Sequence, residues 1–246
     1  MLSALSGGFM GARYGQSPAR VVALHGWQRS HTDFAAVLDG LDAVAPDLPG
    51  FGATSAPASA WGAAGYAEAL LPLVDGETVP VVVLGHSFGG RIAVMLASAR
   101  PDLVTALVLT GAPLVRPPGV PIPRPSLGLR AAKVLNRIGV VSDKRLEDHR
   151  RRSGPADYRA ATGVMREVFV KVIAEYNDGV YARAMRELRC PVEMVWGADD
   201  TAAPLGGAYA AAELASDAKL TVLPGVGHLT PLVAPEQLRT AIERHL

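Results

Sequence analysis

The sequence predicts an α/β protein with a mostly parallel central sheet, flanking helices and a helical cap insertion. Strand-like and helix-like segments alternate along most of the 246 residues, and the alternation stops between Thr110 and Pro191. Hydrophobic residues make up 49% of the chain and charged residues 19%, which is typical of a globular protein. A chain of this length can form one large domain with a substantial core.

The strand predictions follow the order of the chain. Two short strand-like runs, Leu2–Ser6 and Phe9–Tyr14, flank a pair of glycines, and we expect them to form a leading hairpin. Six further apolar runs have the composition of buried parallel strands. These runs are Arg20–His25, Asp42–Pro46, Val79–Gly85, Leu103–Thr110, Pro191–Trp196 and Lys219–Leu223.

Helix-like segments separate these runs, and one stretch departs from the pattern. The regular ones are Thr32–Leu38, Gly65–Leu73, Ser87–Arg100, Gly206–Ala215 and Pro235–His245. Six prolines between residues 113 and 125 exclude a regular helix there. Four helix-compatible segments follow them: Leu127–Ile138, Lys144–Arg151, Tyr158–Ala174 and Tyr181–Leu188. Because so short a set of helices buries little core of its own, we expect residues 113–189 to cap a core made of residues 1–112 and 190–246.

The segment Gly85–Gly90, which reads GHSFGG, joins a predicted strand directly to a predicted helix. A serine at such a turn adopts a strained backbone conformation that raises its hydroxyl above the sheet edge. Gly85 and Gly89 flank Ser87 at two residues on either side, where we expect strand and helix backbones to come too close for side chains. Ser87 is therefore a candidate nucleophile, and the alternative is a serine that only caps the helix.

A serine nucleophile needs a base within hydrogen-bond reach and an acid that orients this base. His228 follows the strand ending at Leu223, and two neighbouring carboxylates, Asp199 and Asp200, follow the strand ending at Trp196. Parallel strands present their carboxyl ends at one edge of a sheet, which is where ligands bind. We therefore expect one of these carboxylates to meet His228 and Ser87 there.

Five stretches together resemble the alpha/beta-hydrolase fold serine hydrolases, in the order of that family and over nearly the whole chain. They are residues 24–27 (LHGW), 47–52 (DLPGFG), 85–90 (GHSFGG), 196–204 (WGADDTAAP) and 225–228 (GVGH). The resemblance is to esterase-like, single-domain prokaryotic members. It implies Ser87 as nucleophile, His228 as general base and Asp200 as acid, because Asp200 stands four residues from both Trp196 and Pro204. Asp199 remains the alternative acid.

Acyl transfer also requires donors for the oxyanion of the tetrahedral intermediate. We expect these donors to be the backbone N–H groups of Phe88 and Trp27. We expect the Trp27 and Phe88 side chains to line the substrate pocket, with a purely structural core role as the alternative. The stretch Asp47–Gly52 is interpreted as a structural turn rather than a source of another catalytic acid.

The resemblance implies an enzyme without metal or other cofactor, a carboxylesterase-like serine hydrolase that cleaves small-molecule esters or thioesters through an acyl-serine. The alternative is a lyase or C–C bond hydrolase with the same triad, such as the menaquinone-pathway lyases, which the sequence Gly89-Gly90-Arg91 resembles. A non-catalytic receptor on this fold is disfavoured by the complete triad.

Charge and targeting signals limit the partners. Residues 116–189 hold 16 Lys and Arg against 8 Asp and Glu, which favours an anionic substrate or simply reflects a solvated helical surface. The run His149–Arg152 is too short, and lacks the interleaved aromatic residues, to indicate nucleic-acid binding. No apolar run approaches the ~20 residues that span a membrane, and no signal peptide is recognisable. With Cys190 as the single cysteine, we expect a cytoplasmic protein whose oligomeric state stays open.

Overall fold

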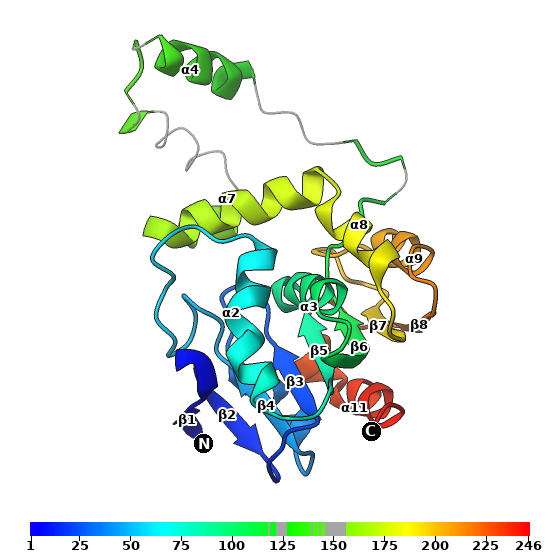
Figure 1. Ribbon diagram of the computed structural model, residues 1–246. Coiled ribbons are helices and arrows are strands. Elements are labelled where there is room, and N and C mark those ends of the chain that lie inside the picture. The colour runs from blue at the N-terminus through cyan, green and yellow to red at the C-terminus, as the bar shows by residue number, and fades with distance from the viewer. Residues whose placement is uncertain (118, 122–126, 139, 143, 146–155) are drawn as a thin grey trace.

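The computed structural model describes residues 1–117, 119–121, 127–138, 140–142, 144–145 and 156–246. Within them the strands form an eight-stranded sheet in the order β1-β2-β4-β3-β5-β6-β7-β8 (Figure 1). The antiparallel pairs are β1 with β2 and β2 with β4, whereas the strands from β4 through β3 to β8 pair in parallel. The strands are β1 (Leu2–Ala4), β2 (Met10–Tyr14), β3 (Val21–Leu24), β4 (Ala43–Pro46), β5 (Val81–His86), β6 (Val104–Thr110), β7 (Val192–Gly197) and β8 (Ala218–Leu223).

The predicted strands are all present. Strands β1 and β2 pair in the register Leu2↔Ala12 and Ala4↔Met10, which confirms the leading hairpin. The other six strands lie within the six predicted apolar runs, apart from one-residue differences at their ends. The α/β class and the mostly parallel sheet are therefore confirmed.

Helices cover both faces of the sheet because the strand residues alternate between two cores. Val22 and Leu24 of β3 point into a core shared with α2 (Ala63–Asp75), α3 (Phe88–Ala99) and α8 (Val180–Glu187). Val21 and Ala23 point into a core shared with α1 (Ala35–Leu38) and α11 (Pro235–Glu243). The helices outside the β6–β7 segment are η1 (Ser6–Gly8), η2 (His31–Phe34), α1 (Ala35–Leu38), α2 (Ala63–Asp75), α3 (Phe88–Ala99), α9 (Leu205–Ala212), α10 (Thr230–Val233) and α11 (Pro235–Glu243).

The segment between β6 and β7 contains the remaining described helices, α4 (Leu127–Arg137), α6 (Ala156–Ala160), α7 (Gly163–Asn177) and α8 (Val180–Glu187). Figure 1 shows α7 lying across the end of α2, and α4 standing apart from the body of the protein. Helix α8 packs against α3, and Tyr181 and Met185 of α8 are fully buried in the core that holds α2 and α3. The predicted division into core and cap stays a prediction.

The helices of this segment differ from the sequence prediction at one place. The single helix expected over Tyr158–Ala174 is two helices, because Thr162 is extended and Gly163 has a φ of 52°. A left-handed residue cannot continue a right-handed helix, so α6 ends at Ala160 and α7 starts at Gly163. The helix predicted over 144–151 falls mostly outside the described residues. Among the described helices, none combines the length and the apolar character needed to cross a bilayer.

Candidate active site

Ser87 lies at the sharp turn between β5 and α3. Its φ of 53° and ψ of −112° form a strained conformation for a residue with a side chain. A Cβ at position 85 would lie 2.5 Å from the Gly90 Cα, and one at position 89 would overlap the Leu24 carbonyl oxygen. The close approach expected at Gly85 and Gly89 is confirmed, and it holds the serine at the carboxyl edge of the sheet.

A chain of hydrogen bonds joins Ser87 to residues from two other loops. The Ser87 hydroxyl lies 3.1 Å from Nε2 of His228, and Nδ1 of His228 lies 2.9 Å from Oδ2 of Asp200. When Nδ1–H donates to the carboxylate, Nε2 is free to accept the hydroxyl proton. The structure thus brings together the three predicted residues, although Ser87 precedes the other two by more than a hundred positions in the sequence.

Asp200, and not its neighbour Asp199, contacts His228. The Asp200 carboxylate is buried, and its Oδ1 accepts the backbone N–H groups of Ala202 at 2.9 Å and Ala203 at 2.7 Å. These two bonds fix the carboxylate so that Oδ2 faces the imidazole. Asp199 is exposed, and its backbone N–H donates to the Val226 carbonyl at 2.9 Å.

His86 supports the loop that carries His228. Its Nε2–H donates to the His228 carbonyl at 2.9 Å, and the two rings lie 5.0 Å apart between centroids. Burial lowers the pKa of His86 to about 4, with His228 adding to the effect, so the ring stays neutral near pH 7.

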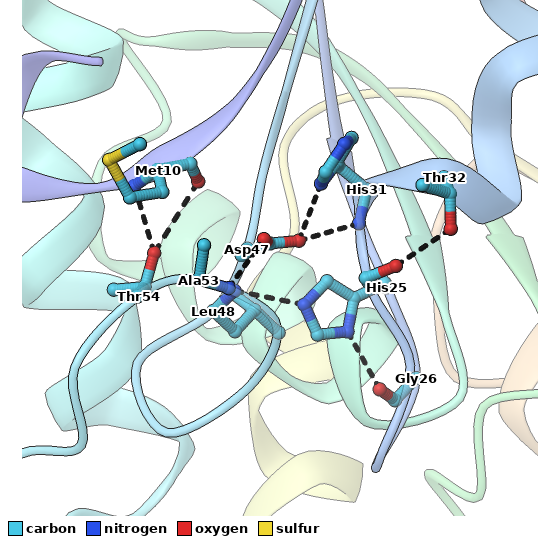
Figure 2. Close-up of polar contacts among 10 residues, drawn as sticks. Met10, His25, Gly26, His31, Thr32, Asp47, Leu48, Ala53 and Thr54 are labelled. Carbon is cyan, nitrogen blue, oxygen red and sulfur yellow. Dashed lines mark hydrogen bonds and ion pairs between the residues drawn. The ribbon is translucent and has the colours of Figure 1, made fainter. Parts of the chain in front are cut away.

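A second network holds the turn before Trp27 (Figure 2). His25 accepts the Leu48 N–H at Nε2, over 2.9 Å, and donates from Nδ1 to the Gly26 carbonyl at 2.8 Å. Burial lowers the pKa of His25 to about 4, so this imidazole is also neutral. These bonds link the loop after β3 to the loop after β4.

Asp47 organises the adjoining turn. Its carboxylate accepts the backbone and ring N–H groups of His31, both at 2.8 Å, and the backbone N–H of Ala53 at 2.9 Å (Figure 2). Burial would raise the pKa of Asp47, but these hydrogen bonds outweigh it and lower the pKa. Since these contacts hold the turn itself and join it to η2, Asp47 has the structural role expected of it.

The two predicted oxyanion donors are the backbone N–H groups of Trp27 and Phe88. Among the described residues, no acceptor is found for the N–H groups of Trp27 and Phe88, whereas the next N–H, of Gly89, donates to the His25 carbonyl at 3.1 Å. Trp27 and Phe88 also line the cavity that contains Ser87 and His228. The structure therefore places both predicted oxyanion residues beside the serine.

The cavity measures about 320 Å³. One of its walls is aromatic: the Trp27 ring meets Phe51, Phe88 and Phe169 edge-on, at centroid distances of 4.9, 5.5 and 5.2 Å. The lining residues that sequence reasoning did not assign are Arg91, Pro113, Asp157, Phe169, Val172, Ile173 and Ala202. Phe169, Val172 and Ile173 share the i, i+3, i+4 spacing of one helix face, a signal that could have pointed to them.

Within the described parts of the chain, no group of three His, Cys, Asp or Glu side chains is arranged to hold a metal ion. The site itself offers the Ser87 hydroxyl, the His228 imidazole and nearby backbone N–H groups. They can move a proton from a hydroxyl to an imidazole and offer N–H groups to a developing negative charge.

The fold and the site define a class of α/β proteins in which a Ser–His–Asp chain lies at the carboxyl edge of the sheet. The sequence profile of the alpha/beta hydrolase family matches residues 21–241, and the chain belongs to this family. The predicted family and fold are thereby confirmed.

Relatives agree with this membership, and a solved structure agrees with the fold. A pimeloyl-acyl-carrier-protein methyl ester esterase of Aromatoleum aromaticum is 30% identical over 246 aligned residues, 91% of this chain and 96% of the relative. Lipase LipV of Mycobacterium tuberculosis is 46% identical over 106 residues, which are only 39% of either chain. The solved structure of a Paleococcus ferrophilus monoacylglycerol lipase superposes with a TM-score of 0.68 at 19% identity, covering 99% of this chain and 98% of that one.

Proposed function

We propose that the protein is a serine hydrolase that cleaves carboxylic esters through an acyl-serine intermediate. The observation that carries the proposal is the hydrogen-bond chain from Ser87 through His228 to Asp200, at 3.1 and 2.9 Å. Family membership supports hydrolysis, and the names of the relatives, a lipase and a methyl ester esterase, support an ester bond as the target.

In the first half of the reaction, the Ser87 oxygen attacks the ester carbonyl while its proton passes to Nε2 of His228. The buried Asp200 carboxylate stabilises the imidazolium that forms. The carbonyl oxygen, now negative, accepts the N–H groups of Trp27 and Phe88; in hydrolases, losing one such donor costs on the order of 10²–10³ in kcat. His228 then gives its proton to the departing alkoxide, which leaves as the alcohol.

In the second half, water enters where the alcohol left. His228 takes a proton from this water, the hydroxide attacks the acyl carbonyl, and the same two N–H groups receive the oxyanion again. Collapse of the intermediate breaks the bond to Ser87, and His228 returns the proton to the Ser87 oxygen. We propose that residues 113–189 cap this site, since α7 supplies Phe169, Val172 and Ile173 to the cavity wall.

The test combines labelling with turnover. A fluorophosphonate should modify Ser87, as read by peptide mass spectrometry, and p-nitrophenyl acetate should be hydrolysed with a trappable acyl group on Ser87. Ser87→Ala should abolish labelling and lower kcat by several orders of magnitude. Ser98→Ala, a matched change within the following helix α3, should leave both unchanged.

Three outcomes would contradict the proposal. Labelling at a residue other than Ser87, or turnover that survives Ser87→Ala, would remove the nucleophile. A labelled Ser87 in a protein that hydrolyses neither esters nor thioesters would favour the lyase or C–C hydrolase alternative.

A further inference from the structure

Arg91 is a buried cation beside the candidate nucleophile. It lies one helical turn after Ser87 in α3, and only 7% of its surface is exposed. Side chains in helices lean toward the N-terminus, which directs Arg91 back toward the Ser87 end of α3. Arg91 lines the cavity of Ser87 and also a second one of about 190 Å³. The two cavities share Pro113, Ile173 and Ala202, so Arg91 lies between neighbouring spaces.

The contacts of Arg91 leave its charge only partly compensated. Its Nε–H donates to the Pro113 carbonyl at 3.0 Å, and its Cζ lies 5.4 Å from the Tyr176 ring centroid and 5.3 Å from that of Tyr181. Among the described residues, no carboxylate forms an ion pair with it. The neighbouring Glu175 uses Oε2 to accept the Tyr181 hydroxyl and the Ala63 N–H, at 2.7 and 3.0 Å.

Burying the Arg91 guanidinium in this way costs free energy unless another group compensates its charge. A buried cation without a direct ion pair loses hydration, and stacking on aromatic rings and the charge of the nearby Glu175 replace it only in part. Burial lowers the pKa of Arg91, but an arginine keeps its proton in proteins. The described residues offer no acceptor to the two Nη groups, and these atoms are not sealed from solvent. They are therefore available to a molecule in the cavities.

A carboxylate matches this vacant donor pair. The planar guanidinium presents parallel N–H groups that bind both oxygens of a carboxylate. Asp157 is the one carboxylate among the described lining residues of the Ser87 cavity, and it is exposed, so water screens its effect on a bound anion. The described lining includes no basic side chain from residues 116–189, the region whose charge favoured an anionic substrate in the sequence.

We infer that Arg91 binds a carboxylate on the acyl part of the substrate, which makes half-esters of short dicarboxylic acids the preferred substrate class. This inference rests on the proposed ester hydrolysis. A carboxylate held on the acyl part keeps the acyl-enzyme oriented until water arrives, whereas one on the alcohol would retain the leaving group. Ser87 and Arg91 are separated by only about 6 Å along the helix axis, so a short spacer is required.

The experiment compares two nearly isosteric series that differ in charge. The substrates are the monomethyl esters of succinic, glutaric and adipic acids, and the methyl esters of the corresponding monoamides, with methanol release as the readout. Wild type should prefer the acids. In Arg91→Met, the acid-to-amide ratio of kcat/KM should fall about 10- to 100-fold, the range expected for loss of a hydrogen bond between charged groups.

Arg116→Met is the matched control. Arg116 also stacks on Tyr176, with its Cζ at 5.0 Å from the ring centroid, but it does not line either cavity. Arg116→Met should keep the wild-type ratio, and Arg91→Lys should recover part of it. Equal losses for acids and amides in Arg91→Met, or a wild type without preference, would show a merely structural arginine and overturn the inference.

A binding measurement tests the role of Arg91 independently of the proposed hydrolysis. In Ser87→Ala, calorimetry should show monomethyl glutarate binding more tightly than the amide analogue, and the additional Arg91→Met change should remove that difference. If phosphonates fail to label Ser87 in wild type, the proposed hydrolysis fails, while the calorimetric difference still decides the role of Arg91. Equal binding of acid and amide overturns the inference even in an active esterase.

Discussion

Ser87 has a backbone conformation that few residues with a side chain adopt, and hydrogen bonds of the surrounding backbone hold it there. Its N–H donates to the Thr110 carbonyl at 3.0 Å, while the Gly90 N–H donates to the Ser87 carbonyl at 3.1 Å. The glycines at 85 and 89 let strand and helix approach until no side chain fits between them. The strain is therefore balanced by β5, β6 and α3 together, and the hydroxyl is presented without a flexible loop.

The neighbouring carboxylates Asp199 and Asp200 provide a matched pair for mutation. Asp200→Asn should leave the His228 tautomer wrong for accepting the Ser87 proton, and kcat for an ester should fall on the order of 10⁴-fold. Asp199→Asn, at an exposed position, should change kcat by less than a few-fold. Steady-state kinetics with p-nitrophenyl acetate measures kcat for both variants. Comparable losses of kcat in the two would be incompatible with Asp200 as the acid that orients His228.

For single residues, the sequence predicted the site well where a residue directly follows the end of a strand. The family resemblance preferred Asp200 over Asp199 by its distance from Trp196 and Pro204, and the structure places Asp200 against His228. Arg91 and Phe169 were not predicted as cavity residues. The spacing of Phe169 with Val172 and Ile173 indicates a helix face, but the neighbour that this face or Arg91 meets depends on the angle at which the helices cross. The linear sequence does not contain that angle.

At the scale of elements, Glu175 joins three helices. From α7 its Oε2 accepts the Ala63 N–H in the first turn of α2 and the Tyr181 hydroxyl from α8. The negative charge also lies at the N-terminal end of α2, where the helix dipole favours it. One carboxylate therefore bonds helix α7, which forms part of the cavity wall, to both α2 and α8.

Glu175→Ala should lower the free energy of unfolding by about 1–3 kcal/mol, because it leaves a buried N–H and a buried hydroxyl without their acceptor. Glu167→Ala, an exposed change on the same helix, should stay within about 0.5 kcal/mol of wild type. Urea denaturation followed by circular dichroism measures both. Similar stabilities for the two variants would show that the Glu175 contacts add nothing.

The strands were predicted well and the insertion less well, for a physical reason. A buried parallel strand needs an uninterrupted apolar run, and such runs are visible in Val79–Gly85 or Leu103–Thr110. The break between α6 and α7 depends on the backbone of Thr162 and Gly163. An isolated glycine in a helical pattern is often tolerated, so the sequence alone favoured one continuous helix.

For the molecule as a whole, two buried histidines link stability to pH. Burial lowers the pKa of both His25 and His86 to about 4, whereas an unfolded histidine titrates near 6.5. Between these values the unfolded chain binds protons that the folded protein excludes, so stability decreases as the pH falls. Each histidine contributes up to roughly 3 kcal/mol, fully present above about pH 6.5 and lost on acidification to pH 4.

We therefore expect the free energy of unfolding to fall steeply from about pH 6.5 to pH 5. The slope should correspond to about two more protons bound by the unfolded chain than by the folded protein. His86→Gln should be less stable at neutral pH but should show a slope nearer one proton. Urea unfolding at several pH values provides the slopes. A free energy that stays constant across this interval would contradict neutral, buried imidazoles at these positions.

Asp47 and Glu77 extend the acid sensitivity below that range. Burial opposes ionisation of both, yet hydrogen bonds lower the pKa of each, from His31 and Ala53 to Asp47 and from Arg13 and Ala19 to Glu77. A carboxyl group with a lowered pKa stabilises the fold above its unfolded value and loses that effect as the pH falls through its folded value. Both histidines and both carboxylates thus lower the free energy of unfolding as the pH falls.

The burial of α8 has a consequence for protein engineering. Because Tyr181 and Met185 fill the interior next to α3, a chimaera that exchanged everything between β6 and β7 would also remove part of the interior packing. The left-handed Gly179, directly before α8, is the natural junction for such an exchange. Helices from another protein could replace the segment before Gly179 to alter substrate specificity. The native chain from Gly179 onward would then keep α8 packed against α3, the helix that follows Ser87.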